Sequence, residues 1–281
     1  MRSQRLLRLR RKFWRTQLYV LLIMLSAIYL VPFFWAFTTS LKDRGAIFEY
    51  PPRLFPREFR FQNYLEAFSM YPWLTFFRNS VIITTLSVLG TLLSSPFIAF
   101  GFAVLRFPGR RALFFLVLLT MMIPYYTTLI PRYMLFKQLG WIDTFYPLFV
   151  PDFFGNAFFI FLLRQYFMGI PRSLFEAAKI DGASTLRIYW NIYFPLARPA
   201  VITVGILQFM TVWSDFIGPL IFLQSPEHYT LVLGLNAFRG VYFTYWHYLC
   251  AMALVISIPP IIFFFIGQKR IIGGITISGL K

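Results

Sequence analysis

Five polar side chains interrupt two long apolar runs of this sequence, where such groups are costly unless they find a partner. They are Asp152, Asn156, Gln208, Thr211 and Asp215. The spacing of Gln208, Thr211 and Asp215 predicts that these three share one face of a helix. Their chemistry allows two roles. They could contact a polar solute in a water-filled path, or they could hydrogen-bond neighbouring helices.

Other reactive residue types are scarce in the chain. It has two histidines, His228 and His247, and one cysteine, Cys250. The histidines lack metal-ligand spacing, so we expect no metal site and place both at an interface of the outer side. A single cysteine excludes an intrachain disulfide, and we assign it a packing role. This set is too poor for a convergent catalytic site, which disfavours a membrane enzyme.

The composition defines the elements that must position these residues. Hydrophobic residues make up 58% of the chain and charged residues only 13%, against about a quarter charged in soluble proteins. Each of three uncharged runs is near or above the roughly 20 residues that cross a bilayer as a helix: 16–41, 79–105 and 112–131. Three further runs lie near 145–163, 199–223 and 248–268. We therefore predict an all-α integral membrane protein with six transmembrane helices in a single domain, residues 1–281.

The distribution of Lys and Arg predicts the orientation of these helices. With the N-terminus inside, 18 of the 27 basic residues fall on the inner side, as the positive-inside rule requires. Both termini are then cytoplasmic, and the net charge of +17 reflects contact with the inner leaflet rather than with nucleic acid. The predicted parts are a basic N-terminus at 1–15, an extracytoplasmic segment at 40–78, a cytoplasmic loop at 164–198 and a cytoplasmic tail at 269–281.

The first half of the 164–198 loop reads as a short helix with clear ends. Ser173 and Glu176 have the spacing of a capping box, which predicts a helix start near Leu174. Gly182 can take the left-handed conformation that ends a helix. Ala177 and Ala178 are small enough to permit close approach by another backbone.

A second helix follows in the same loop. Ser184 or Thr185 can cap it, and Pro195 and Pro199 can end it. An apolar stripe at helical spacing runs along it: Leu186, Tyr189, Trp190 and Tyr193. The hairpin could lie on the inner leaflet as an amphipathic connector, or its first helix could sit in a groove of another protein.

The segment "EAAKIDGASTLRIYWNIYFP" resembles the EAA loop of the membrane subunits of ATP-binding-cassette importers. The match comprises Glu176-Ala177-Ala178, Gly182, Ile192 and Phe194-Pro195, with Phe194 where the family usually has Leu. Further segments, such as "FRNSVIITTL", "FLLRQYFMGIP" and "WSDFIGPLIFL", are similar to the carbohydrate branch, particularly the smaller of the two maltose-type permeases. Ser214 stands where that branch commonly has Asn, so no particular sugar follows.

The resemblance implies that this chain forms half of a sugar translocation path in a bacterial or archaeal cytoplasmic membrane. Its expected partners are a second permease, two nucleotide-binding subunits that bind ATP and Mg²⁺, and an extracytoplasmic sugar-binding protein. The chain lacks a phosphate loop of its own, so it is expected to bind no cofactor and to hydrolyse no ATP. The residues expected to couple it to the ATPase subunits are Glu176, Ala177, Ala178, Asp181, Gly182, Ala183 and Ser184.

The expected sugar path combines the five polar residues with aromatic side chains that could stack on a sugar ring: Trp213, Tyr125 and Tyr126. The 40–78 segment, with the proline-rich "EYPPRLFP", should be extended and turn-rich, and it could receive the binding protein or merely cap the bundle. An importer of another solute remains an alternative. An ion-coupled secondary transporter is less favoured, because the sequence shows no inverted repeat.

Overall fold

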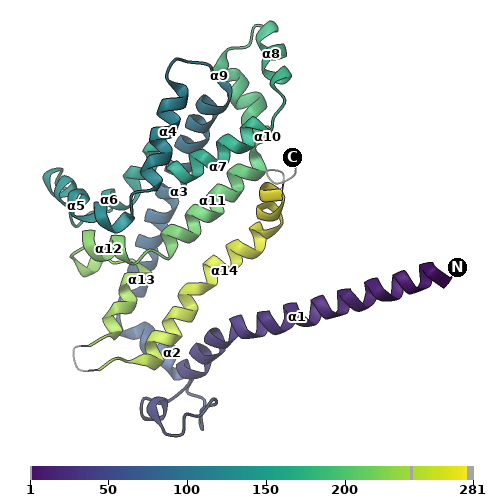
Figure 1. Cartoon of the computed structure of the whole chain (residues 1–281). Coiled ribbons are helices and arrows are strands. Elements are labelled where there is room, and N and C mark those ends of the chain that lie inside the picture. Colours follow the sequence, from purple (N-terminus) through teal and green to yellow (C-terminus); the bar gives the residue numbers. More distant parts are fainter. Residues whose placement is uncertain (1, 241–242, 277–281) are drawn as a thin grey trace. The chain divides into compact units, whose positions relative to one another are not determined.

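The computed structural model describes residues 2–240 and 243–276 (Figure 1). In these ranges the chain forms helices and turns, with one isolated β-bridge between Arg239 and Thr244. The residues group into two compact units. The first contains the chain up to Tyr71 together with Phe238–Val255, and the second contains Pro72–Ala237 together with the chain from Ile256 onward.

In the first unit, a buried asparagine organises a turn-rich segment. This unit contains α1 (Arg2–Ser40), η1 (Gly45–Phe48), α2 (Gln62–Met70) and the start of α14 (Trp246–Thr276). The side-chain amide of Asn63 donates to the backbone carbonyls of Ser40, at 2.8 Å, and Lys42, at 2.9 Å. These bonds fasten α2 to the end of α1. The chain between Glu49 and Arg60 has no helix, as its prolines predicted.

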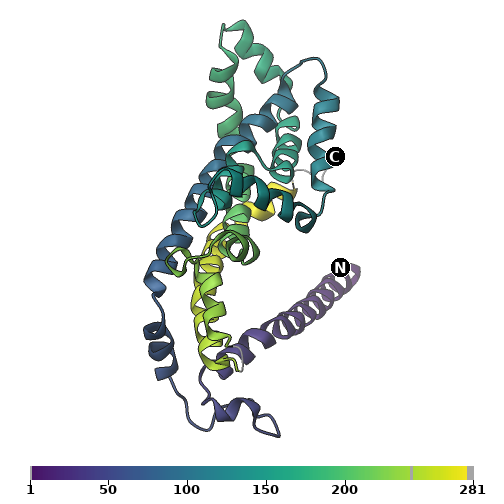
Figure 2. The ribbon, with the colours of Figure 1, turned by 90° about the vertical axis from the view of Figure 1, so that its left-hand side faces the viewer.

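The second unit is built around α3 (Trp73–Val104), which packs most extensively against α7, α11 and η3. Figures 1 and 2 show these helices side by side, with α8 and α9 projecting from one end. The longer helices around α3 are α4 (Arg110–Met121), α7 (Ala157–Met168), α8 (Arg172–Ile180) and α11 (Arg198–Trp213). The shorter elements are η2 (Tyr125–Thr128), α5 (Leu129–Gln138), α6 (Tyr146–Phe149), η3 (Val150–Phe154), α9 (Thr185–Ile188), η4 (Tyr189–Tyr193), α10 (Phe194–Leu196), α12 (Ile217–Phe222), η5 (Pro226–His228), α13 (Leu231–Gly234) and η6 (Leu235–Phe238).

An aromatic cluster forms the core at the end of this unit that carries α8 and α9. The ring of Phe100 lies 5.2 Å from that of Tyr189 and 5.1 Å from that of Tyr193, and it also contacts Phe167 at 6.1 Å. All four side chains are buried. Each well-oriented ring pair contributes about 0.5–1.5 kcal/mol beyond burial. The cluster therefore fixes the base of the α8–α9 segment on α3 and α7.

Length and apolar composition identify the membrane-spanning candidates. Among the described residues four helical segments qualify: Phe13–Ser40, Trp73–Val104, Tyr146–Met168 and Trp246–Gln268. Two bent pairs qualify only when their halves are taken together. Arg110–Met121 and Tyr125–Gln138 meet at 96°, and Thr185–Leu196 and Arg198–Trp213 meet at 76°.

Two predicted spans differ from the observed helices. The run 112–131 is not one straight helix, because α4 ends at Met121 and Pro124, which has no N–H to donate, lies in the break. The run 199–223 is also interrupted, since α11 ends at Trp213 and α12 begins at Ile217. The predicted tail 269–281 is helical as far as Thr276, and its last five residues lie outside the described ranges.

Candidate functional site

The first helix of the predicted hairpin, α8, begins earlier than expected and without a capping box. Its N-cap residue is Pro171, which offers no side-chain acceptor, so Ser173 already lies inside the helix. Glu176 pairs instead with Arg172, with Nε and Oε1 3.1 Å apart. The capping-box prediction was wrong because a proline that favours a helix start stands two residues before Ser173.

The end of α8 has the geometry that the sequence predicted. Gly182 has φ of +77°, in the left-handed region. The Gly182 N–H donates to the Lys179 carbonyl at 3.1 Å, and the Ala183 N–H donates to the Ala178 carbonyl at 2.9 Å. This pair of bonds is a Schellman motif, which satisfies the last carbonyls of a helix. The turn directs the chain into the second helix.

The second helix starts with the predicted serine cap. The Arg187 N–H donates to the Ser184 hydroxyl at 3.3 Å. The helix then runs through a π-helical turn at Tyr189–Tyr193 into Phe194–Leu196. The predicted apolar stripe is divided, because Tyr189 and Tyr193 are buried in the aromatic core whereas Leu186 and Trp190 are exposed. It is therefore not one continuous amphipathic face.

The hairpin has an anchored side and a free side. Phe175 and Ala178 of α8 pack with Ile188 against the aromatic core, and Ala183 also contacts that core. The other residues that were predicted to couple the chain to an ATPase are exposed: Glu176, Ala177, Asp181, Gly182 and Ser184. Beside them Ile180 is 87% exposed. A rigid base that carries an exposed, partly apolar surface is suited to dock on another protein.

The polar residues inside the second unit form a hydrogen-bonded network. The Gln208 amide of α11 donates to the Ser87 hydroxyl of α3 at 2.7 Å, and that hydroxyl donates to the carboxylate of Asp152 in η3. A second α3 serine, Ser94, donates to the backbone carbonyl of Asp152 at 2.9 Å. Gln208 and Ser87 are buried. The network ties three elements together, which is the helix-holding role of intramembrane polar groups.

Asn156, four residues after Asp152, caps a helix. Its side-chain oxygen accepts from the backbone N–H groups of Phe158, at 3.0 Å, and Phe159, at 3.4 Å. Asparagine is among the most favourable N-cap residues. Asn156 therefore marks the point where α7 begins after η3.

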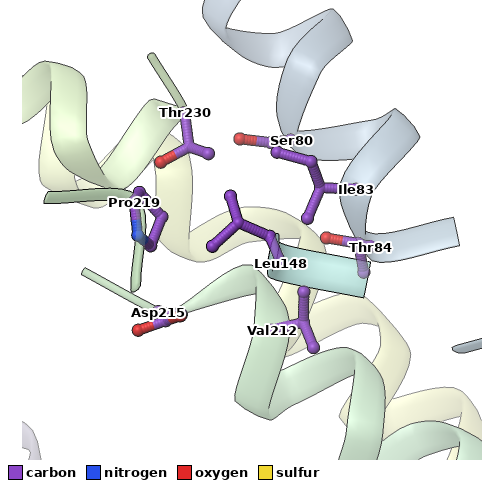
Figure 3. Close-up of a pocket in the computed structure, with 8 residues that line it drawn as sticks. All are labelled: Ser80, Ile83, Thr84, Leu148, Val212, Asp215, Pro219 and Thr230. Atoms are coloured by element: carbon purple, nitrogen blue, oxygen red, sulfur yellow. The ribbon is translucent and has the colours of Figure 1, made fainter. Parts of the chain in front are cut away.

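Asp215 lies apart from the network, beside a small cavity (Figure 3). The cavity measures about 30 Å³, which is room for about one water molecule. Ser80, Thr84 and Thr230 supply its other polar walls. Asp215 accepts the Gly218 N–H at 3.2 Å and so begins α12.

The predicted common face of Gln208, Thr211 and Asp215 is not formed. The helix ends at Trp213, before Asp215. Gln208 is buried, whereas Thr211 is exposed and its hydroxyl donates to the Leu207 carbonyl of its own helix. Asp215 uses its carboxylate to start the next helix, so the helical spacing does not continue to it.

The aromatic candidates have different environments. Trp213 is buried, its N–H donates to the Ile256 carbonyl at 3.1 Å, and its ring stacks on Phe209. Tyr125 and Tyr126 are exposed in the break between α4 and α5. The guanidinium of Arg132 lies 5.4 Å from the Tyr125 ring centroid, which brings a cation to this break. Arg132 was not identified from the sequence.

A polar stripe along α3 was not predicted from the sequence. Buried hydroxyl residues recur along this helix at intervals of three and four: Ser80, Thr84, Ser87, Thr91 and Ser95. That spacing places them on one face. It was visible in the sequence as a regular polar pattern within an uncharged run, and it identifies the face of α3 that packs inward.

Asp143, in the loop before α6, joins that loop to the one that follows α12. Asp143 accepts the backbone N–H groups of Gln224 and Ser225, each at 2.9 Å, and it also accepts the Ser225 hydroxyl. His228 Nδ1 lies 3.1 Å from the same carboxylate. Burial alone would raise the pKa of Asp143, but the bonds from Ser225 and Gln224 outweigh it and hold the pKa well below its usual range. The other histidine, His247, belongs to the first unit and is buried.

Comparison with known proteins gives the class of this chain. Residues 95–275 match the family described as the inner membrane component of binding-protein-dependent transport systems. The chain is 34% identical over 274 residues to AraQ, an arabinooligosaccharide transport system permease protein of Bacillus subtilis, covering 95% of this chain and 96% of AraQ. It is also 34% identical over 249 residues to a probable ABC transporter permease protein of Pyrococcus horikoshii, covering 88% and 90% of the two chains.

A solved structure agrees with these relatives. The chain is similar to one in the crystal structure of a bacterial ABC transporter involved in the import of the acidic polysaccharide alginate, with a TM-score of 0.78, 26% identity and coverage of 92% and 96%. The chain belongs to the family of binding-protein-dependent inner-membrane transport components. It is a multi-pass permease of this class, and the resemblance stated from its sequence is confirmed.

Proposed function

We propose that this permease imports an oligosaccharide that an extracytoplasmic binding protein delivers, and that partner subunits supply the ATP hydrolysis. Support for the sugar class comes from AraQ and from the alginate transporter. The observation that carries the coupling is the two-sided α8–α9 hairpin, with Phe175, Ala178 and Ile188 anchored in the core and Ala177 and Ile180 exposed.

The hairpin would transmit motion as a rigid lever. Movement of a docked ATPase subunit would press on the exposed side of α8, and the Schellman turn would pass the force to α9. Tyr189 and Tyr193 would then move α3 and α7, because the aromatic core joins them. Packed helices switch between discrete arrangements rather than deform smoothly, so this push would move the path from inward-open to outward-open.

The assembly would contain a second permease, two nucleotide-binding subunits that hold ATP and Mg²⁺, and the binding protein. In this arrangement each bent helix pair counts as one span, which gives six, with both termini and the hairpin in the cytoplasm. The cavity beside Asp215 has room for about one water molecule and cannot hold a sugar. The second permease would therefore supply the remaining walls of the sugar path. Asp152, Asn156, Gln208, Thr211, Trp213 and Asp215 remain the proposed residues along it.

Uptake in cells tests this function. A strain from which this chain is deleted should lose energy-dependent uptake of one oligosaccharide, and the wild-type gene should restore it. Uptake of labelled amino acids and of a monosaccharide with its own carrier serves as the control. If every oligosaccharide in a broad panel enters normally while an unrelated solute does not, the sugar assignment is wrong.

A further inference from the structure

Four arginines converge where the α3–α4 turn meets the end of α7. Arg106, Arg110 and Arg111 come from the turn and the start of α4, and Arg164 comes from α7; we call this group the basic cleft. The surface between them is hollowed in two adjoining clefts of about 200 and 520 Å³ that share Arg110 and Arg111. The positive charge is therefore concentrated at a concave surface.

Two of these arginines are held in place by the end of α3. Arg110 Nη1 donates to the Leu105 carbonyl at 2.7 Å, and Arg164 Nε donates to the Phe102 carbonyl at 3.2 Å. The guanidinium of Arg164 also lies 4.1 Å from the centroid of the Phe114 ring. These contacts leave further N–H groups on both side chains available, in fixed orientations that suit the oxygens of a phosphate.

The charge of the basic cleft is not compensated within the chain. Among the side chains that the structure describes, residues 13–240 and 243–268, no ion pair includes Arg106, Arg110, Arg111 or Arg164. Within those ranges the side chains of Arg110 and Arg164 each donate to a backbone carbonyl, whereas no hydrogen bond holds the exposed side chains of Arg106 and Arg111. Arg110 and Arg164 line the same cleft of about 200 Å³, so their like charges repel each other. An anion from outside the chain would relieve this repulsion.

The floor of the cleft is apolar. Phe114, Phe115 and Leu118 of α4 line its smaller part, and Phe115 is 60% exposed. A ligand that fits must therefore place negative oxygens on the arginines and hydrocarbon along α4. A phospholipid has both parts, whereas a free phosphate leaves the apolar wall uncovered.

We propose that the basic cleft binds the phosphate headgroup of an anionic phospholipid of the cytoplasmic leaflet, with its acyl chains against Phe115 and Leu118. This placement rests on the cytoplasmic orientation given under the proposed function. Basic pockets between transmembrane helices on this side of a membrane suit such headgroups. The bound lipid would brace the α3–α4 turn against α7 close to the aromatic core.

Native mass spectrometry of the full-length chain in neutral detergent tests the site. The delipidated protein is titrated with cardiolipin or with phosphatidylcholine of matched chain length. The test variant is Arg106→Gln/Arg111→Gln, because these two exposed side chains have no structural bond to lose. The matched control is Arg187→Gln/Arg198→Gln, which removes two exposed arginines outside the cleft.

We expect cardiolipin affinity to fall about fivefold for each arginine removed, so about 30-fold for the test pair. The control pair should change it less than twofold, and phosphatidylcholine should bind weakly throughout. Equal losses in the two double variants would overturn the proposal, since binding would then follow total charge. Displacement of cardiolipin by inorganic phosphate at low millimolar concentration would overturn it in favour of a soluble anion. The measurement needs no ATP, sugar or partner, so failure of the uptake test would leave this binding result unaffected.

Discussion

Replacing Gly182 tests whether the hairpin turn couples the permease to its ATPase. Its φ of +77° is costly for any residue with a side chain, and a Cβ at this position would meet no atom within 4 Å. The penalty is therefore conformational and not steric. For Ala it amounts to about 1–2 kcal/mol, which corresponds to a shift of about 5- to 30-fold in the equilibrium for forming the turn.

The assay is sugar-stimulated ATP hydrolysis by the purified complex of this chain with its partner subunits in nanodiscs. We expect the ratio of stimulated to basal hydrolysis to decrease from Gly182 through Asn and Ala to Val. Asn tolerates the left-handed region best of these replacements, and the β-branched Val tolerates it least. For Gly182→Ala the loss in apparent affinity for the ATPase subunits should not exceed about 30-fold, because no other contact is broken.

Gly140 provides the matched control. It has φ of +69° and also has no atom within 4 Å of an added Cβ, but it follows α5 rather than α8. Gly140→Ala should carry the same backbone penalty and leave coupling unchanged. The reasoning is refuted if Gly182→Val keeps the wild-type ratio, or if Gly140→Ala lowers the ratio as much as Gly182→Ala does.

Three further predictions address the orientation of the chain in the membrane, the buried hydrogen-bond network, and the bonds that Asp143 accepts from Gln224 and Ser225. In a background without the native cysteine, Ser184→Cys should react with a membrane-impermeant thiol reagent only after the cells are opened, and labelling of intact cells would contradict the cytoplasmic placement. Gln208→Leu should lower the thermal unfolding midpoint, because it removes a hydrogen-bond donor from the network at a cost of about 1 kcal/mol. The control Thr211→Val should leave the midpoint unchanged. Equal midpoints for the two variants would mean that the network contributes little to stability. The carboxylate of Asp143 has a lowered pKa, so its contribution to stability is present above about pH 4 and lost as the pH falls. The wild-type protein should therefore lose more thermal stability than Asp143→Asn between pH 7 and pH 3. Parallel losses would mean that the Asp143 carboxylate does not stabilise the contact between the two loops.

Some features of the chain could be predicted because they depend on near neighbours in the sequence. The Schellman turn needs only a glycine after a helix, and the Ser184 cap needs only an oxygen three residues before the Arg187 N–H. The uninterrupted apolar lengths of the first and last spans likewise survive in α1 and α14. The capping box failed at the same local level, because Pro171 offered an earlier start that competed with Ser173.

Tertiary packing decided which side chains came together. Ser87 meets Asp152 across 65 residues of sequence and Gln208 across 121, so no local rule could pair them. Packing also divided the aromatic stripe of the hairpin, burying Tyr189 and Tyr193 and leaving Trp190 exposed. The physical reason is that a periodic pattern gives the faces of a helix, but burial depends on which neighbours fill the space beside each face. Near-neighbour patterns were enough for the first and last spans, the Gly182 turn, the Ser184 cap and the family motif, whereas the network, the anchored side of the hairpin and the convergence of four arginines exist only in the folded chain.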